Sequence, residues 1–279
     1  MMPTKDHGHI CRPDIVGSLH RSGTWLLLRG LTREAGHWGD FPCQLQAALP
    51  EARILAIDLP GNGTLHRQAS PSTIPAMVAA CRAELATRGV AGPVHLVAMS
   101  LGAMVAVAWA AAHPDELSGS VLINGSLRGI NPLHQRLQPA SWLPLMSVPL
   151  KRTARDKEAA ILRLTSHRAP PDVLDDWERL AGQHPVSTRN ALRQLLAAAR
   201  FKAPTSQPGV PMLVLCGGQD ALVSPECSLA IARRWDLPVH LHRDAGHDLP
   251  LDDGAWVAAR IKDWAAWLDS APPQPPRAG

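Results

Sequence analysis

The sequence contains no tyrosine, and it has only two phenylalanines against nine tryptophans. Tyrosine can therefore serve neither as an acid or base nor as an oxyanion donor in this protein. Cysteine is also sparse: the five cysteines are an odd number, lie far apart and include no CxxC pair. This spacing excludes a disulfide framework and a cysteine zinc site, and it is typical of a reducing compartment.

Long runs of one charge are missing as well. The 28 basic and 24 acidic residues are scattered and leave a net charge of only +4, which argues against a nucleic-acid-binding surface. The opening residues MMPTKDHGHICRPD contain no apolar stretch, so we expect no secretory signal and predict a cytoplasmic protein. Hydrophobic residues make up 46% of the chain, which is enough to form a core and excludes a fully disordered chain.

One segment is almost free of polar groups. Residues 94–112 read VHLVAMSLGAMVAVAWAAA, and their length alone would allow a membrane span. The β-forming VHLV, the Ser-Leu-Gly break and the alanine-rich run after it favour a buried strand, a tight turn and a buried helix. We therefore predict no membrane span.

Short apolar runs alternate with helical patterns along most of the chain. The predicted strands are Thr24–Leu28, Arg53–Asp58, Val94–Ala98, Ser120–Asn124, Met212–Cys216 and Val239–His242, and the predicted helices cover about 36–49, 73–88, 101–113, 225–235 and 254–268. Apolar strands that alternate with helices predict an α/β fold with a doubly wound, mostly parallel sheet. Ligands then bind at the carboxyl ends of the strands.

The segment 126–208 interrupts this alternation. It has no convincing strand, but it has helical patterns at Asp156–Thr165, Val173–Leu180 and Thr188–Phe201 with prolines between them. A structureless loop of this length is improbable in a compact domain, so we predict an inserted helical cap over 126–208. The core would then comprise 23–125 and 209–269, with flexible ends at 1–22 and 270–279.

Three segments place reactive side chains just after predicted strands. In Ala98-Met99-Ser100-Leu101-Gly102 a strand enters and a helix leaves, and the small residues on either side of Ser100 suit a tight strand–helix turn that raises the serine above the sheet. Asp220 follows the strand ending at Cys216, and His247 follows the strand ending at His242. Because parallel strands end at one edge of a sheet, these three side chains can converge there.

These motifs resemble those of the α/β-hydrolase superfamily over roughly residues 24–268. The order Ser, Asp, His is the family's own. Leu26–Leu31 resembles its first strand and the His-Gly-x loop after it, and Asp58–Gly63 resembles its Asp-x-Pro-Gly-x-Gly segment. The departures are Arg29 in place of the common His and Ala98 in place of Gly.

The resemblance implies a serine hydrolase with a catalytic triad. Ser100 would be the nucleophile, His247 the base that takes its proton, and Asp220 the carboxylate that orients the imidazole. The oxyanion would accept hydrogen bonds from the backbone N–H groups of Leu101 and Leu31. A substrate pocket under the cap would include Trp142, Met146 and Trp177.

We expect attack on a small to medium carboxylic ester, with no metal or organic cofactor and no nucleic-acid partner. A thioesterase, a lactonase, an amide or C–C hydrolase using the same triad, and a silent ligand-binding member of the fold remain open. The sequence does not give the oligomeric state.

Other candidates are weaker. Four aspartates near His247 are too close to it in sequence to come from a separate strand end: Asp244, Asp248, Asp252 and Asp253. Asn124 follows a strand at which some family members carry the acid, but it is not a carboxylate. His240 and His242 share one face of a strand and could bind a metal, but no third ligand is evident. The N-terminal His7 and His9 show no pattern that indicates a site. Gly61-Asn62-Gly63 is interpreted as a turn rather than a nucleotide-binding loop.

Overall fold

The structure is a computed structural model, and it describes residues 23–270. The segments 1–22 and 271–279, which the sequence predicts to be flexible, lie outside the described residues.

Six parallel strands form one sheet in the order β2-β1-β3-β4-β5-β6. They are β1 Thr24–Leu28, β2 Arg53–Ile57, β3 Val94–Met99, β4 Leu117–Ile123, β5 Met212–Gly217 and β6 Val239–His242. The predicted α/β fold is confirmed, and the chief difference in the strands is that β4 begins at Leu117 rather than at Ser120.

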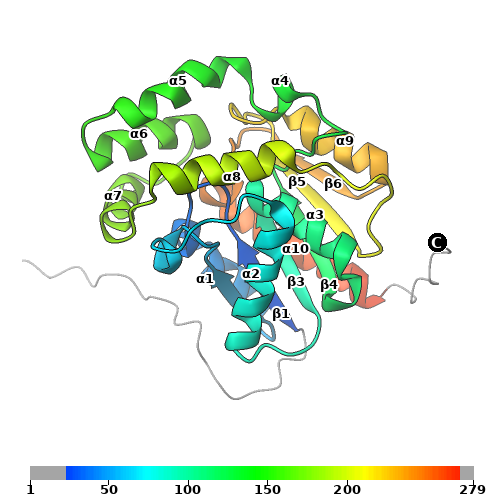
Figure 1. Ribbon diagram of the computed structural model, residues 1–279. Helices are drawn as coiled ribbons and strands as arrows, with labels where there is room; N and C mark the ends of the chain where they lie inside the picture. The colour runs from blue at the N-terminus through cyan, green and yellow to red at the C-terminus, as the bar shows by residue number, and fades with distance from the viewer. Residues whose placement is uncertain (1–22, 271–279) are drawn as a thin grey trace, which may run out of the picture.

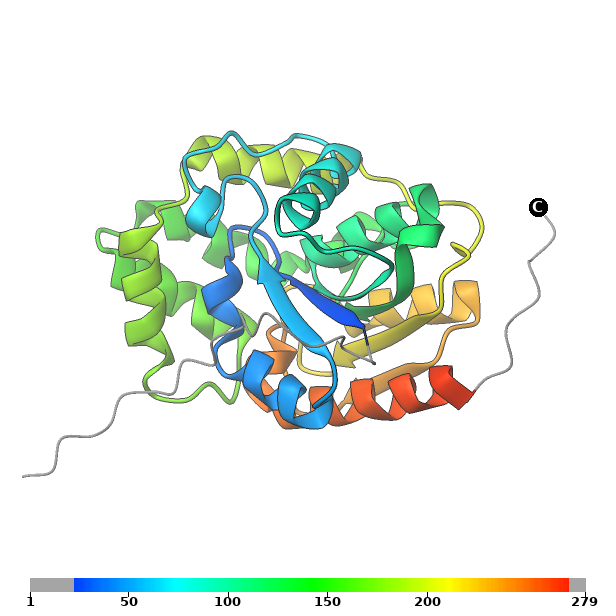
Figure 2. The same ribbon diagram turned by 90° about the horizontal axis from the view of Figure 1, so that it is seen from below.

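Helices cover both faces of this sheet. Figure 2 shows α1 (Phe41–Ala48) and α10 (Leu249–Ser270) along one face and α2 (Ile74–Thr87) and α3 (Leu101–Ala112) on the other; α9 (Pro225–Trp235) belongs to the same core as α2 and α3. The helix predicted over 36–49 is divided into a short 3-10 turn at Ala35–Trp38 and α1, with a positive φ of 53° at Gly39 between them. Helix α10 begins earlier than predicted and contains a kink at Asp253.

The strand residues explain why two separate cores form. Trp25 and Leu27 of β1 belong to the core under α1 and α10, whereas Leu26 and Leu28 belong to the core under α2, α3 and α9. Successive side chains of a strand point to opposite faces, so an unbroken apolar run fills both. Each such side chain, when fully buried, contributes about 1.5–3 kcal/mol.

Five α-helices occupy the segment between β4 and β5. They are α4 Leu133–Arg136, α5 Trp142–Ser147, α6 Ala154–Thr165, α7 Val173–Gln183 and α8 Thr188–Arg200, and Figure 1 shows them gathered on one side of the sheet. Helices α4 and α5 were not predicted, since four and six residues are too short to show a helical period. The division of the chain into a core and a cap stays a prediction.

The apolar segment 94–112 is a strand and a helix buried inside the fold, β3 and α3. Among the helices that the structure describes, none is long and apolar enough to cross a membrane.

Candidate active site

Ser100 lies in the tight turn between β3 and α3. Its φ of 55° and ψ of −113° are values that residues with side chains rarely adopt. The turn is fixed because the Ser100 N–H donates to the Ile123 carbonyl oxygen at 2.9 Å. Small neighbours are required here: a Cβ on Gly102 would lie 2.5 Å from the Leu28 carbonyl oxygen, and one on Gly30 would lie 3.1 Å from the Ser100 Cβ. The turn thus holds Ser100 at the carboxyl edge of the sheet.

Asp220 and His247 form a buried hydrogen-bonded pair at the same edge. The Asp220 Oδ2 atom accepts a hydrogen bond from His247 Nδ1 at 2.7 Å, while its Oδ1 accepts the backbone N–H groups of Leu222 and Val223 at 2.9 Å each. These contacts fix the carboxylate, which in turn orients the ring so that Nε2 is the nitrogen left for proton transfer. Both side chains are almost fully enclosed.

The pKa of His247 lies above its ordinary value as a result of opposing effects. Burial lowers the pKa, because a low-dielectric site disfavours the imidazolium. The charge and hydrogen bond of Asp220 raise the pKa, as does the charge of Asp248, while the charge of Arg29 lowers it. An imidazole stabilised in this way can take up a proton from a neighbouring hydroxyl.

The loop that carries His247 is held by contacts on several sides. Asn124, at a positive φ of 47° just after β4, donates to the carbonyl oxygens of Gly246 and His247 at 3.1 and 2.7 Å. Asp252 accepts the Gly246 N–H at 2.6 Å, and the Asp248 N–H donates to the Thr165 carbonyl oxygen at 2.6 Å. Asn124 therefore does not serve as the acid; it connects β4 to the histidine loop.

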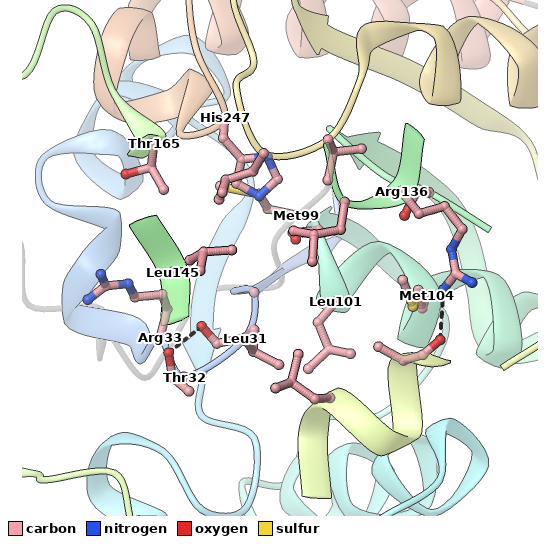
Figure 3. Close-up of a pocket in the computed structure, with 18 of the residues that line it drawn as sticks. Leu31, Thr32, Arg33, Met99, Leu101, Met104, Arg136, Leu145, Thr165 and His247 are labelled. Carbon is pink, nitrogen blue, oxygen red and sulfur yellow. Dashed lines mark hydrogen bonds between the residues drawn. The ribbon is translucent and has the colours of Figure 1, made fainter. Parts of the chain in front are cut away.

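A cavity of about 670 Å³ opens beside Ser100 and His247, which both line it. This size is in the usual range for a small-molecule site. Its wall is mainly apolar, with leucines from several elements, and α4, α5, α6 and α8 all contribute lining residues. In Figure 3 the His247 ring projects into the cavity, with Leu31 and Leu101 below it and Arg136 to one side.

The two predicted oxyanion donors, Leu31 and Leu101, also line this cavity. Leu101 is the first residue of α3, so its N–H lies in the first turn, where backbone donors have no partner within the helix and the dipole favours negative charge. The loop that contains Leu31 is held by a hydrogen bond at the next residue. Thr32, at a positive φ of 56°, donates its N–H to Gln194 Oε1 of α8 at 2.8 Å.

Arg29, the main departure from the family pattern, makes a buried ion pair. Its guanidinium donates to both carboxylate oxygens of Asp248, at 2.9 and 2.6 Å. Asp248 is thus bound to Arg29 and is not the acid that orients His247.

The three residues predicted for the substrate pocket, Trp142, Met146 and Trp177, are not among those that line this cavity. Trp177 is buried beneath Arg33, whose guanidinium lies 4.3 Å from the ring centre. Trp142 and Met146 lie on α5 and point outward, with exposed fractions of 45% and 72%. Leu145 of the same helix faces the cavity instead. The amino-acid pattern of a six-residue helix does not reveal which of its faces is buried.

Other nucleophiles and metal ligands find little support between residues 23 and 270. Burial raises the pKa of Cys81, Cys216 and Cys227 to about 12, so these thiols stay protonated. No group of three or more His, Cys, Asp or Glu side chains is placed to hold a metal in these residues. His242 instead contacts Asp253 at 3.2 Å, and His240 is exposed.

Comparison with known proteins agrees with this fold. The profile of the alpha/beta hydrolase family matches residues 25–260, and the chain belongs to that family. Among solved structures, a candidate lipase (lip1) of Acinetobacter baumannii AYE is 21% identical with a TM-score of 0.73, covering 89% of this chain and 85% of that one. A malate-bound esterase of Thermogutta terrifontis is 21% identical with a TM-score of 0.69, covering 88% and 90%.

One curated relative shares a shorter stretch. Lipase LipV of Mycobacterium tuberculosis is 39% identical over 99 residues, which is 36% of either chain. The match thus spans about a third of that lipase.

Three residues that contact this site are not identified as such by the sequence. The sequence presents Asn124 only as a non-carboxylate at a position where some family members carry the acid, Asp248 only as a neighbour of His247, and Gln194 without any distinguishing feature. The polar residue directly after β4 was a usable signal for Asn124. No sequence signal pairs Arg29 with Asp248, since 219 positions separate them.

Proposed function

We propose that the protein is a serine hydrolase that cleaves a small to medium carboxylic ester through an acyl-enzyme on Ser100. The observation that carries this proposal is the buried Asp220–His247 hydrogen bond of 2.7 Å at the wall of a cavity that Ser100 also lines from its strained turn.

The chemistry proceeds in two steps. His247 takes the proton of the Ser100 hydroxyl as its oxygen attacks the ester carbonyl, and Asp220 stabilises the imidazolium that forms. The N–H groups of Leu31 and Leu101 stabilise the oxyanion, each by about 3 kcal/mol. The imidazolium gives its proton to the departing alcohol, and His247 then activates a water that releases the acid.

The cavity supports an ester with an apolar acyl or alcohol part. Leucine and methionine side chains from the sheet edge and from α4, α5 and α8 line it, so a hydrocarbon chain would lose its water on entering. The related proteins described as lipases and an esterase are consistent with this chemistry, although one fold can carry many activities.

The test is fluorophosphonate labelling followed by mass spectrometry of the labelled peptide, together with hydrolysis of nitrophenyl esters of increasing chain length. We expect labelling at Ser100 and loss of both labelling and turnover in Ser100→Ala. Ser126→Ala is the matched control, because Ser126 also lines the cavity but is not in the turn. The Ser126→Ala protein should still be labelled at Ser100. Folded wild-type protein that is neither labelled nor active would contradict the proposal.

A further inference from the structure

Arg29 and Asp248 form an ion pair at the wall of the cavity. Their side chains are 2% and 3% exposed, and no other ion pair of the described residues that borders the cavity has both side chains below 5%. The guanidinium donates two hydrogen bonds to the carboxylate, from Nη1 to Oδ1 at 2.9 Å and from Nη2 to Oδ2 at 2.6 Å. Such two-point pairing of arginine with a carboxylate adds directional specificity to the charge attraction.

The pair joins the two loops on which the proposed reaction depends. Arg29 follows β1 and directly precedes Gly30 and Leu31, the loop expected to supply an oxyanion donor. Asp248 directly follows His247. Further contacts fix both partners: the Arg29 guanidinium lies 4.8 Å from the Trp38 ring centre and 3.4 Å from the Met99 sulfur, and the Asp248 N–H is bound by Thr165.

The two charges act on His247 in opposite directions. Asp248 raises the pKa of the imidazole and Arg29 lowers it. The other ionisable side chains that face this loop are Asp220, which is bound to the ring, and Asp252 and His167, which pack against Gly246. Removing one member of the pair would therefore leave an uncompensated charge beside the base.

We propose that the Arg29–Asp248 ion pair is a positioning device that fixes the His247 loop against the oxyanion loop and keeps two opposite charges balanced beside the imidazole. The catalytic part of this inference rests on the proposed function. Neither residue is assigned a direct step in the reaction.

The test compares four variants with the wild-type chain: Asp248→Asn, Arg29→Met, Arg29→Lys and the double variant Arg29→Met/Asp248→Asn. In Asp248→Asn the permanent charge of Arg29 is no longer balanced, so the pKa of His247 falls. The acid limb of the pH profile, where kcat/KM falls because His247 becomes protonated, should then move to lower pH by about 0.5–1 unit, a modest shift for a nearby charge.

The double variant removes both charges, and its acid limb should return to the wild-type position. Arg29→Lys keeps the charge but lacks the planar fork, so its limb should stay in place while kcat falls about 10–100-fold from loss of alignment. Arg29→Met removes the positive charge that lowers the pKa of His247, so its limb should move to higher pH. A merely structural pair would lower stability without separating these variants by pH.

A second measurement does not need activity: NMR titration of the His247 ring in each folded variant. A lower His247 pKa in Asp248→Asn with recovery in the double variant supports the proposal, whereas an unchanged or higher pKa in Asp248→Asn overturns it. If Asp248→Asn does not fold, the double variant and Arg29→Lys decide, since neutral replacement of both partners is tolerated better than removal of one. Absence of Ser100 labelling in the wild-type chain would count against the proposed function alone.

Discussion

Glycine at position 102 shows how a single residue sets the geometry of this site. Its Cα faces the end of β1, and an added Cβ would lie 2.5 Å from the Leu28 and 2.9 Å from the Arg29 carbonyl oxygen. Backbone atoms cannot rotate away as side chains can. Gly102→Ala should therefore push the start of α3 away from β1, which costs about 1–3 kcal/mol of the free energy of unfolding. The resulting shift of Ser100 should lower kcat/KM on the order of 100-fold.

Gly182→Ala is the matched control for Gly102→Ala. Gly182 lies in α7, and its added Cβ would meet no atom within 4 Å. This change should raise stability by roughly 0.5–1 kcal/mol, because alanine favours the helix, and leave activity unchanged. Urea unfolding and ester hydrolysis measure both variants. If both alanines behave alike, the close approach at Gly102 is not what positions Ser100.

The Ser100 turn could be predicted from sequence, whereas its surroundings could not. A strand, a serine and a helix with small flanking residues are local features, and local patterns are what a sequence displays directly. The pairing of Arg29 with Asp248 and the outward direction of Met146 depend on how distant segments pack. No local pattern contains that information.

Helix α8 positions the oxyanion loop through one buried side chain. Gln194, with an exposed fraction of 0%, accepts the Thr32 N–H at 2.8 Å and donates to Asn62 Oδ1 at 2.7 Å. Asn62 in turn donates to the Arg33 carbonyl oxygen at 2.9 Å. A helix from the segment 126–208 therefore holds the loop that follows β1, a role its amphipathic pattern did not reveal.

Gln194→Leu tests this contact between helix and loop. Leucine has a similar volume but leaves the Thr32 N–H and the Asn62 amide oxygen without their partner, which should cost about 2–4 kcal/mol in total. Because the adjacent Leu31 N–H would lose its alignment, kcat should fall more than KM changes. Leu192→Ala on the same helix is the control, since Leu192 is 60% exposed; equal kinetics in the two variants would contradict a role of Gln194 in the loop.

At the scale of the whole molecule, burial of neutral histidines makes folding depend on pH. Burial lowers the pKa of His95 to about 4 and lowers that of His37 well below its ordinary value. His95 stacks on Trp25 with ring centres 4.3 Å apart, and Asp269 partly opposes the shift. The unfolded chain binds a proton at each site near the ordinary value of 6.5, so stability falls as the pH drops from about 6.5 towards 4. His247, whose pKa is raised, acts in the opposite direction.

His95→Phe isolates one of these contributions. Phenylalanine keeps a ring beside Trp25 and does not titrate, and the His95 Nδ1 atom has no hydrogen-bond partner to lose among the described residues. Above about pH 6.5 the two proteins should unfold at similar urea concentrations. As the pH falls to about 4.5, the variant should become more stable than the wild-type chain by roughly 1–3 kcal/mol, since each unit of pKa shift corresponds to about 1.4 kcal/mol. His37 and His247 are unchanged in both proteins, so they cancel in this difference. Parallel stability curves between pH 7.5 and 4.5 would mean that His95 takes up its proton in the folded state as easily as in the unfolded one.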